Sequence, residues 1–229
     1  MILSELIQRS PIRIFEQSIH GGLKAGEIGI IASQAGIGKT SVLVQLALDK
    51  LLQGKKVIHV SFTQHTHHVL AWYEDIFNEF ISKKNLENAG DVKNDLVKNR
   101  VLMNFNQDGM SKDLITKGLK AMIVEGGFGA EAIIIDGFDF SRADYERIDC
   151  IKTLARELNL SIWYSCTVKD TVRQDSPPEL NAIANLIDVV IMLNPKPDHI
   201  ELSVIKDRDV RDTRSMAMRL DPKTLLIRE

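Results

Sequence analysis

The sequence GEIGIIASQAGIGKTSVL, residues 26–43, joins a short apolar run to a segment with helical periodicity through a glycine-rich loop. The apolar run at 26–33 predicts a buried strand, and the periodic segment predicts a helix at 39–53. A strand that passes through a short loop directly into a helix is the opening unit of an α/β domain. This stretch therefore decides the expected fold class.

Apolar strands and amphipathic helices continue to alternate downstream of this unit. We expect strands at 55–62, 100–105, 132–136, 160–166 and 188–194, and helices at 69–84, at 111–127 and within 147–159. This rhythm predicts an α/β fold with a mainly parallel central sheet flanked by helices. Residues 199–220 alternate with period two around a charged turn, so they predict an antiparallel hairpin that extends the sheet.

Length and composition fit one domain, since the 229 residues are 44% hydrophobic and suffice for a sizeable core. We divide it into a polar N-terminal arm (1–20), a core (21–195) and a C-terminal hairpin region (196–229). The cysteines, Cys150 and Cys166, have neither metal-binding nor disulfide-framework spacing, so we interpret them as buried thiols.

Net charge and hydropathy limit the partners of the chain. A formal net charge of −2 gives no global positive field that would attract nucleic acid or an anionic membrane. The N-terminus has no apolar run of signal-peptide length, and we find no apolar stretch long enough to span a membrane. The sequence therefore predicts a soluble cytoplasmic protein without a membrane partner.

The loop SQAGIGKT, residues 33–40, matches the phosphate-binding pattern G-x-x-x-x-G-K-[ST] at every position except the first, which is Ser33. Its glycines let backbone N–H groups turn inward toward a phosphate. Lys39 would reach the β- and γ-phosphates, and the Thr40 hydroxyl would coordinate Mg²⁺. The expected nucleotide-binding residues are Ser33, Gln34, Ala35, Gly36, Ile37, Gly38, Lys39, Thr40 and Ser41. The plainer alternative is a glycine-rich turn that only caps a helix.

The stretch AEAIIIDGFDF, residues 130–140, places Asp136 where a buried strand should emerge from the core. A phosphate-binding loop needs such a carboxylate at a neighbouring strand tip to hold the water shell of Mg²⁺. We therefore expect Thr40 and Asp136 to share the metal, with Asp136 acting through water. Asp139 is a weaker candidate, and an acidic residue that merely starts a loop is the alternative.

Several motifs in order resemble the RecA-like ATPases, most closely the motor domain of DnaB-type replicative helicases and their KaiC and RadA relatives. The matching segments are GGLKAGE (21–27), the phosphate loop, 109–136, 151–166, 179–194 and LDPKT (220–224). The helicase branch also often lacks the first glycine of the loop. The resemblance implies ATP and Mg²⁺ as cofactors and a homo-oligomeric ring or filament with nucleotide sites between subunits.

Two positions depart from the family pattern. In the family, the second strand ends near a glutamate that polarises the attacking water, but VSFTQH at 60–65 has Thr63 and Gln64 there. Neither takes a proton as a carboxylate does, although a glutamine can orient a water, so we expect slow hydrolysis. The family's sensor glutamine is replaced by Cys166, a weak hydrogen-bonding group.

The KDR tripeptide at 206–208 resembles the Lys-x-Arg that the family inserts into the ATP site of the neighbouring subunit. The resemblance implies that Lys206 and Arg208 act in trans, and two residues at this spacing on one strand point to the same side. An ordinary charged hairpin is the alternative, because such turns are common on surfaces.

The loops that would face a ring channel are not basic. Residues 139–149 carry four acidic side chains against two arginines, and residues 167–179 carry three acids against Lys169 and Arg173. A channel that grips DNA needs net positive charge, so DNA translocation is disfavoured. A nucleic-acid partner and an unidentified protein partner both stay open.

The functional hypotheses follow from these matches and departures. The first is an oligomeric, ATP-dependent switch or motor with slow hydrolysis. The alternatives are a non-catalytic ATP-binding regulatory or scaffolding module, and a helicase or recombinase-type translocase. Phosphoryl transfer to a small molecule has no acceptor signature that we can identify, and ATP rather than GTP is implied by the resemblance alone.

Two further clusters have plain structural interpretations. His65 and His68 have a spacing that can share a metal, but no second ligand cluster is evident, so we expect them to be exposed residues at the start of a helix. The aromatic side chains at helical spacing predict a packed helix face. They are Trp72, Tyr73, Phe77 and Phe80.

Overall fold

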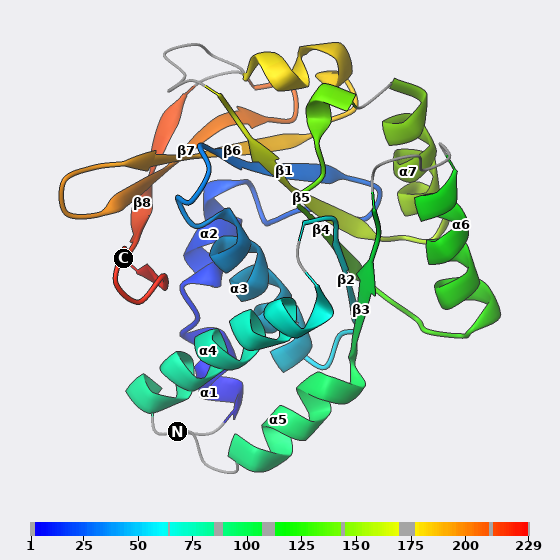
Figure 1. Ribbon diagram of the computed structural model, residues 1–229. Coiled ribbons are helices and arrows are strands. Elements are labelled where there is room, and N and C mark those ends of the chain that lie inside the picture. Colours follow the sequence, from blue (N-terminus) through cyan, green and yellow to red (C-terminus); the bar gives the residue numbers. More distant parts are fainter. Residues whose placement is uncertain are drawn as a thin grey trace.

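The computed structural model describes residues 3–63, 65–84, 89–106, 113–142, 145–169, 177–210 and 213–228. These residues form a nine-stranded sheet in the order β3-β2-β4-β5-β1-β6-β7-β8-β9, with helices on both faces (Figure 1). Neighbouring strands from β3 to β6 pair in parallel, and β7, β8 and β9 continue the sheet with antiparallel pairing. The expected α/β class, the mostly parallel sheet and the antiparallel C-terminal hairpin are confirmed.

The elements that the sequence predicted keep close to their expected ranges. The strands are β1 Ile28–Ser33, β2 Val57–Ser61, β3 Arg100–Asn104, β4 Ala132–Asp136, β5 Ser161–Thr167, β6 Val189–Pro195, β7 Ile200–Asp207, β8 Arg214–Leu220 and β9 Ile227–Arg228. The α-helices are α1 Leu3–Gln8, α2 Ile12–Ser18, α3 Lys39–Leu52, α4 Thr66–Lys84, α5 Ala89–Lys98, α6 Leu114–Lys120 and α7 Tyr145–Glu157. Shorter elements are a π-helical turn η1 Ala121–Glu125 and the 3₁₀ helices η2 Phe140–Arg142 and η3 Pro178–Ile183.

The sheet separates two hydrophobic cores. Helices α1 to α5 pack on one face, and α6 and α7 pack on the other (Figure 1). Strand β1 shows why its sequence is apolar throughout: Ile31 joins the first core, whereas Ile30 and Ala32 join the second. A strand buried on both faces cannot alternate with polar residues, and all six residues of β1 are buried.

The N-terminal arm is a correction to the sequence analysis. Residues 1–20 were expected to be a polar arm, but α1 and α2 lie there and pack against α3. Leu6, Phe15 and Ile19 are each at most 1% exposed and belong to the first core. Ser10 precedes Pro11, the residue that caps α2, and its hydroxyl accepts a hydrogen bond from the Ile12 N–H, so a helix-start signal was present in the sequence.

Helix α5 is an element that the sequence analysis did not predict, since no helix was expected between the helix at 69–84 and the strand at 100–105. Residues 89–98 are helical and bury Leu96 beside α3. Only a narrow apolar stripe marks this helix, since its other positions are mostly polar. The expected helix at 111–127 begins at Leu114 among the described residues and ends in the π-helical turn η1.

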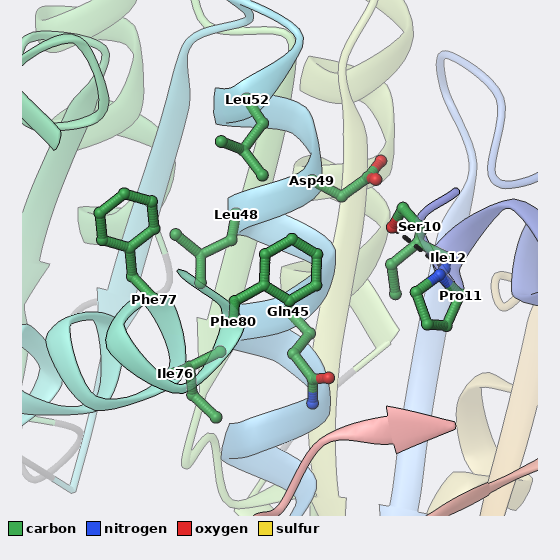
Figure 2. A pocket seen from close by; sticks show the side chains of 10 residues that line it. All are labelled: Ser10, Pro11, Ile12, Gln45, Leu48, Asp49, Leu52, Ile76, Phe77 and Phe80. Atoms are coloured by element: carbon green, nitrogen blue, oxygen red, sulfur yellow. Dashed lines mark hydrogen bonds between the residues drawn. The ribbon is translucent and has the colours of Figure 1, made fainter. Parts of the chain in front are cut away.

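The aromatic face of α4 packs as expected. Tyr73 and Phe77 are buried, and Trp72 and Phe80 pack against the same core with partial exposure. A cavity of about 20 Å³ lies between α4, α3 and the Ser10–Ile12 segment, and Figure 2 shows the side chains that line it. This volume holds about one water molecule, and the side chain of Gln45 that borders it already has hydrogen-bond partners.

Among the described residues, no helix is both long enough and apolar enough to cross a bilayer.

Candidate functional site

The glycine-rich loop (residues 33–40) leaves the carboxyl end of β1 and enters α3. Gly36 and Gly38 have φ values of 79° and 112°, in the left-handed region that favours glycine. A Cβ at Gly38 would also lie 2.7 Å from the Leu220 side chain, whereas no described atom lies within 4 Å of a Cβ at Gly36. The loop is therefore packed at Gly38 and open at Gly36.

Lys39 is held at the mouth of the loop by the loop's own oxygen atoms. Its Nζ donates hydrogen bonds to the Ser33 carbonyl at 3.1 Å, to the Ser33 hydroxyl at 3.3 Å and to the Gln34 carbonyl at 2.9 Å. Burial lowers the pKa of Lys39, and the carboxylate of Asp136 opposes this shift. An ammonium is attracted more strongly to an anionic phosphate than to a neutral carbonyl, so a phosphate can take over these contacts.

The two expected magnesium ligands lie together. The Thr40 hydroxyl donates a 2.8 Å hydrogen bond to the Asp136 carboxylate, although the residues are 96 positions apart in the sequence. Asp136 is 4% exposed at the end of β4. A hydroxyl and a carboxylate in contact, beside a lysine ammonium, form a donor set that suits a hydrated Mg²⁺ bound to a polyphosphate.

These residues line one cleft of about 330 Å³ at the carboxyl edge of the sheet. The cleft, as the term is used below, is bordered by the glycine-rich loop, the segment from Asp136 to Ser141, and residues at the end of β5. Open α/β sheets bind ligands at this edge, and the volume lies within the usual range of ligand sites.

Thr63 lines the cleft two residues beyond β2 and is exposed. Its side chain fills the space that a Cβ at Gly137 would need, and Gly137 has a φ of 77°. Glycine at 137 therefore lets the end of β4 approach Thr63 closely. Gln64, the second residue of the expected catalytic position, lies outside the described residues.

Cys166 does not border the cleft. It is buried in the second core, whereas its neighbours Ser165 and Thr167 line the cleft, because successive strand side chains point to opposite faces. Burial raises the pKa of the Cys166 thiol to about 12. Ser165 accepts a 2.8 Å hydrogen bond from the Gly137 N–H and so holds the segment after Asp136.

Lys206 and Arg208 are not on one strand, which corrects the geometric expectation. Strand β7 ends at Asp207, and Arg208 follows it with a φ of 57°. Lys206 Nζ donates hydrogen bonds to the carbonyl oxygens of Ala184, at 2.6 Å, and Ile187. Both side chains therefore have partners within their own chain.

Arg208 lies at the edge of the sheet opposite the cleft. It makes a two-bond contact with Glu27, which precedes β1, and its remaining N–H groups donate to Asp207 and to the carbonyls of Ile19 and Gly22. Six residues of β1 separate this edge from the glycine-rich loop, a span of roughly 20 Å at about 3.3 Å per residue. Arg208 cannot reach the cleft of its own chain.

His65 and His68 are exposed at the start of α4, as expected. Within the described ranges, no three His, Cys, Asp or Glu side chains gather in a way that could hold a metal. The ring of His67, which lies between them in the sequence, contacts the ring of His68 at 4.0 Å between centroids.

Sequence reasoning missed several residues that border the cleft. Ser165, Thr167, Lys169 and Glu179 all line it, and they come from β5 and the segment that follows. Their position after a buried strand that neighbours the loop strand was the available signal, because parallel strands bring their carboxyl ends to one edge. Parts of both acidic loops, residues 143–144 and 170–176, lie outside the described residues.

A comparison with protein-family models finds no match, and a comparison with curated proteins finds none either.

Proposed function

We propose that this chain is a Mg-ATP-binding, RecA-like ATPase that acts as an oligomeric, nucleotide-dependent switch or motor with slow hydrolysis. The observation that carries the proposal is the contact between Thr40 and Asp136 beside the buried ammonium of Lys39. Backbone N–H groups of the loop would bind the phosphates, and the hydroxyl and carboxylate would hold the hydrated Mg²⁺. Slow hydrolysis is supported by Thr63, which lines the cleft without a carboxylate.

Nucleotide binding is tested by titrating the protein with a fluorescent ATP analogue in Mg²⁺ and in EDTA. We expect Lys39→Ala to weaken binding about 10- to 100-fold, since a charge-assisted hydrogen bond contributes about 1.5–3 kcal/mol. Asp136→Asn should remove most of the Mg²⁺ dependence. Lys196→Ala, at an exposed lysine paired with Glu201, is the matched control and should leave binding unchanged. Equal binding by all four proteins would contradict the assignment.

Assembly is tested in the same samples by measuring mass in solution with and without a non-hydrolysable ATP analogue. A ring or filament that forms only with nucleotide would support the switch and the trans-acting assignment of Lys206 and Arg208. A stable monomer in both conditions would favour the second candidate, a non-catalytic ATP-binding regulatory module. The intrachain bonds of Arg208 favour this second candidate, because an arginine that acts in trans must first release them.

A further inference from the structure

The chain keeps the side-chain alternation of β5 for two residues beyond the end of that strand. Cys166 and Val168 are buried in the second core. Ser165, Thr167 and Lys169, which alternate with them, line the cleft. Successive residues of an extended chain point to opposite sides, so this alternation places the Lys169 side chain on the cleft side. Lys169 is exposed, and a ligand in the cleft can therefore reach its ammonium group.

The backbone around Lys169 is attached to the elements on both sides of it. Thr167 is paired with Ser33, the first residue of the glycine-rich loop, and the Val168 N–H donates a 3.0 Å hydrogen bond to the Ser33 carbonyl. The N–H of Lys169 itself donates a 3.1 Å hydrogen bond to the carboxylate of Glu179, which belongs to η3. Lys169 is thereby held beside the start of the glycine-rich loop.

This position flanks the space that the terminal phosphate of a bound nucleotide would occupy. Mg²⁺ held by Thr40 and Asp136 would bridge the β- and γ-phosphates, which puts the γ-phosphate between the glycine-rich loop and the end of β4. Strand β5 lies between β1 and β4, so the residues that follow it stand beside this space. The flexible four-carbon stem of Lys169 lets its ammonium group approach an oxygen of that phosphate.

The charge of the cleft also favours a cation at this place. Among the described residues that line the cleft, the carboxylates are those of Asp136, Asp139 and Glu179, and the ammonium groups are those of Lys39 and Lys169. Without Lys169, these side chains would carry three negative charges against one positive charge, and such a lining repels a polyphosphate. Lys169 therefore offsets part of the repulsion that a triphosphate would meet.

We propose that Lys169 binds the γ-phosphate of the nucleotide in the cleft and so makes the site prefer ATP to ADP, a role that rests on the nucleotide binding proposed above. An ammonium group donates charge-assisted hydrogen bonds to phosphate oxygens, and ADP has no phosphate at that position. A lysine that acted only through the general charge of the cleft would affect the two nucleotides nearly alike. The affinity for ATP relative to ADP therefore distinguishes the two roles.

The test measures the dissociation constants of Mg-ATP and Mg-ADP for the full chain by competition with a fluorescent nucleotide analogue. We expect Lys169→Ala to weaken ATP binding about 10-fold and ADP binding less than about twofold, because a charge-assisted hydrogen bond from an exposed lysine lies at the low end of its range. Lys169→Arg should keep the preference for ATP within about threefold, since it keeps a cation on a long side chain. Lys196→Ala, at an exposed lysine that follows β6, is the matched control and should leave both constants unchanged.

A second neutral variant separates the loss of charge from the loss of side-chain volume. Lys169→Met keeps a long unbranched side chain without the ammonium group, so it should lose the preference for ATP as Lys169→Ala does. Wild type without a preference for ATP, an equal effect of Lys169→Ala on both nucleotides, or a preserved preference in Lys169→Met would each overturn the assignment of Lys169 alone. Wild type that binds neither nucleotide would overturn the proposed function itself.

Discussion

At the residue scale, two adjacent side chains of β5 point to opposite faces of the sheet. Ser165 faces the cleft and bonds to Gly137, whereas the adjacent Cys166 faces the second core and is fully buried. The resemblance matched Cys166 to a sensor position, but one step along a strand reverses the direction of a side chain. The cleft is thereby lined with hydroxyl groups from this strand and not with the thiol.

The two cysteines should differ sharply in reactivity. Cys150 is exposed, which corrects the expectation that both thiols are buried. Burial raises the pKa of Cys166 to about 12, so only about 1 in 10,000 Cys166 thiols is ionised at pH 8. We expect a thiol-specific disulfide reagent to modify one thiol within minutes at pH 8 and the second only in denaturant. Cys150→Ser should abolish the fast reaction. Two fast thiols in the native protein would contradict the burial of Cys166.

At the element scale, the C-terminal segment is attached to the helix that follows the glycine-rich loop. The Ser41 hydroxyl and Gln45 Nε2, both on α3, donate to the carbonyl oxygen of Leu225, and Gln45 Oε1 accepts from the N–H of Ile227 at 2.8 Å. Leu225 has a φ of 54°, an uncommon backbone conformation for leucine that these bonds help to hold. Strand β9 is therefore tied directly to the first turns of α3.

Removing this attachment should loosen the C-terminal segment more than the rest of the protein. We expect Gln45→Ala to reduce stability by about 1–3 kcal/mol, or less if the freed segment is hydrated, because the Ile227 N–H loses its partner. Amide hydrogen exchange should show the loss of protection concentrated at Ile227. Gln53→Ala, which removes a glutamine whose side chain donates to Asp49 of α3, is the control and should leave Ile227 protected.

Strands with a continuous apolar run were predicted well, whereas three short or mostly polar helices were not predicted. Strand β4 at 132–136 has the predicted bounds because five consecutive residues are buried on both faces. Helix α5 was missed because its composition is mostly polar, although Val92 and Leu96 lie four residues apart and both pack against the first core. Helices α1 and α2 were missed for another reason, since the apolar spacing was present but was interpreted as a polar arm.

At the scale of the whole molecule, Arg208 joins the C-terminal hairpin to the segment before β1. Its contacts reach Glu27, Asp207 and the carbonyl oxygens of Ile19 and Gly22, so one side chain fixes parts of the chain that are about 190 residues apart. Burial alone would raise the pKa of Asp207, but hydrogen bonds from His20, Arg214 and Arg208 outweigh it and lower the pKa. The charges at this edge are therefore mutually stabilising.

Loss of Arg208 should destabilise the single chain even without a partner. We expect Arg208→Ala to lower the free energy of unfolding by about 2–4 kcal/mol, because Glu27 loses its arginine and the buried Asp207 keeps only Arg214 and His20. Chemical denaturation measures this, with Arg219→Ala at an exposed position of β8 as the control. An unchanged stability would favour an arginine that acts mainly on a neighbouring subunit.

Arg208→Ala should also change how the stability of the protein depends on pH in the acid range. A carboxyl whose folded pKa is lowered contributes stability that is present above its unfolded pKa, near 3.9, and is lost as pH falls through the folded value. Removing Arg208 should raise the pKa of Asp207 toward normal. Acid unfolding of Arg208→Ala should therefore begin at a higher pH than that of wild type.

The sequence by itself determined the α/β class, the strand–loop–helix unit at 26–53 and the position of Asp136 at a strand end, because these features depend on periodicity and spacing along one element. Only the tertiary structure decided that Glu179 borders the cleft, that Cys166 faces away from it and that Arg208 is held within its own chain. These outcomes depend on which strands are neighbours and which face each side chain takes. Contacts between residues far apart in the sequence leave no local pattern, so they emerge only when the chain is folded.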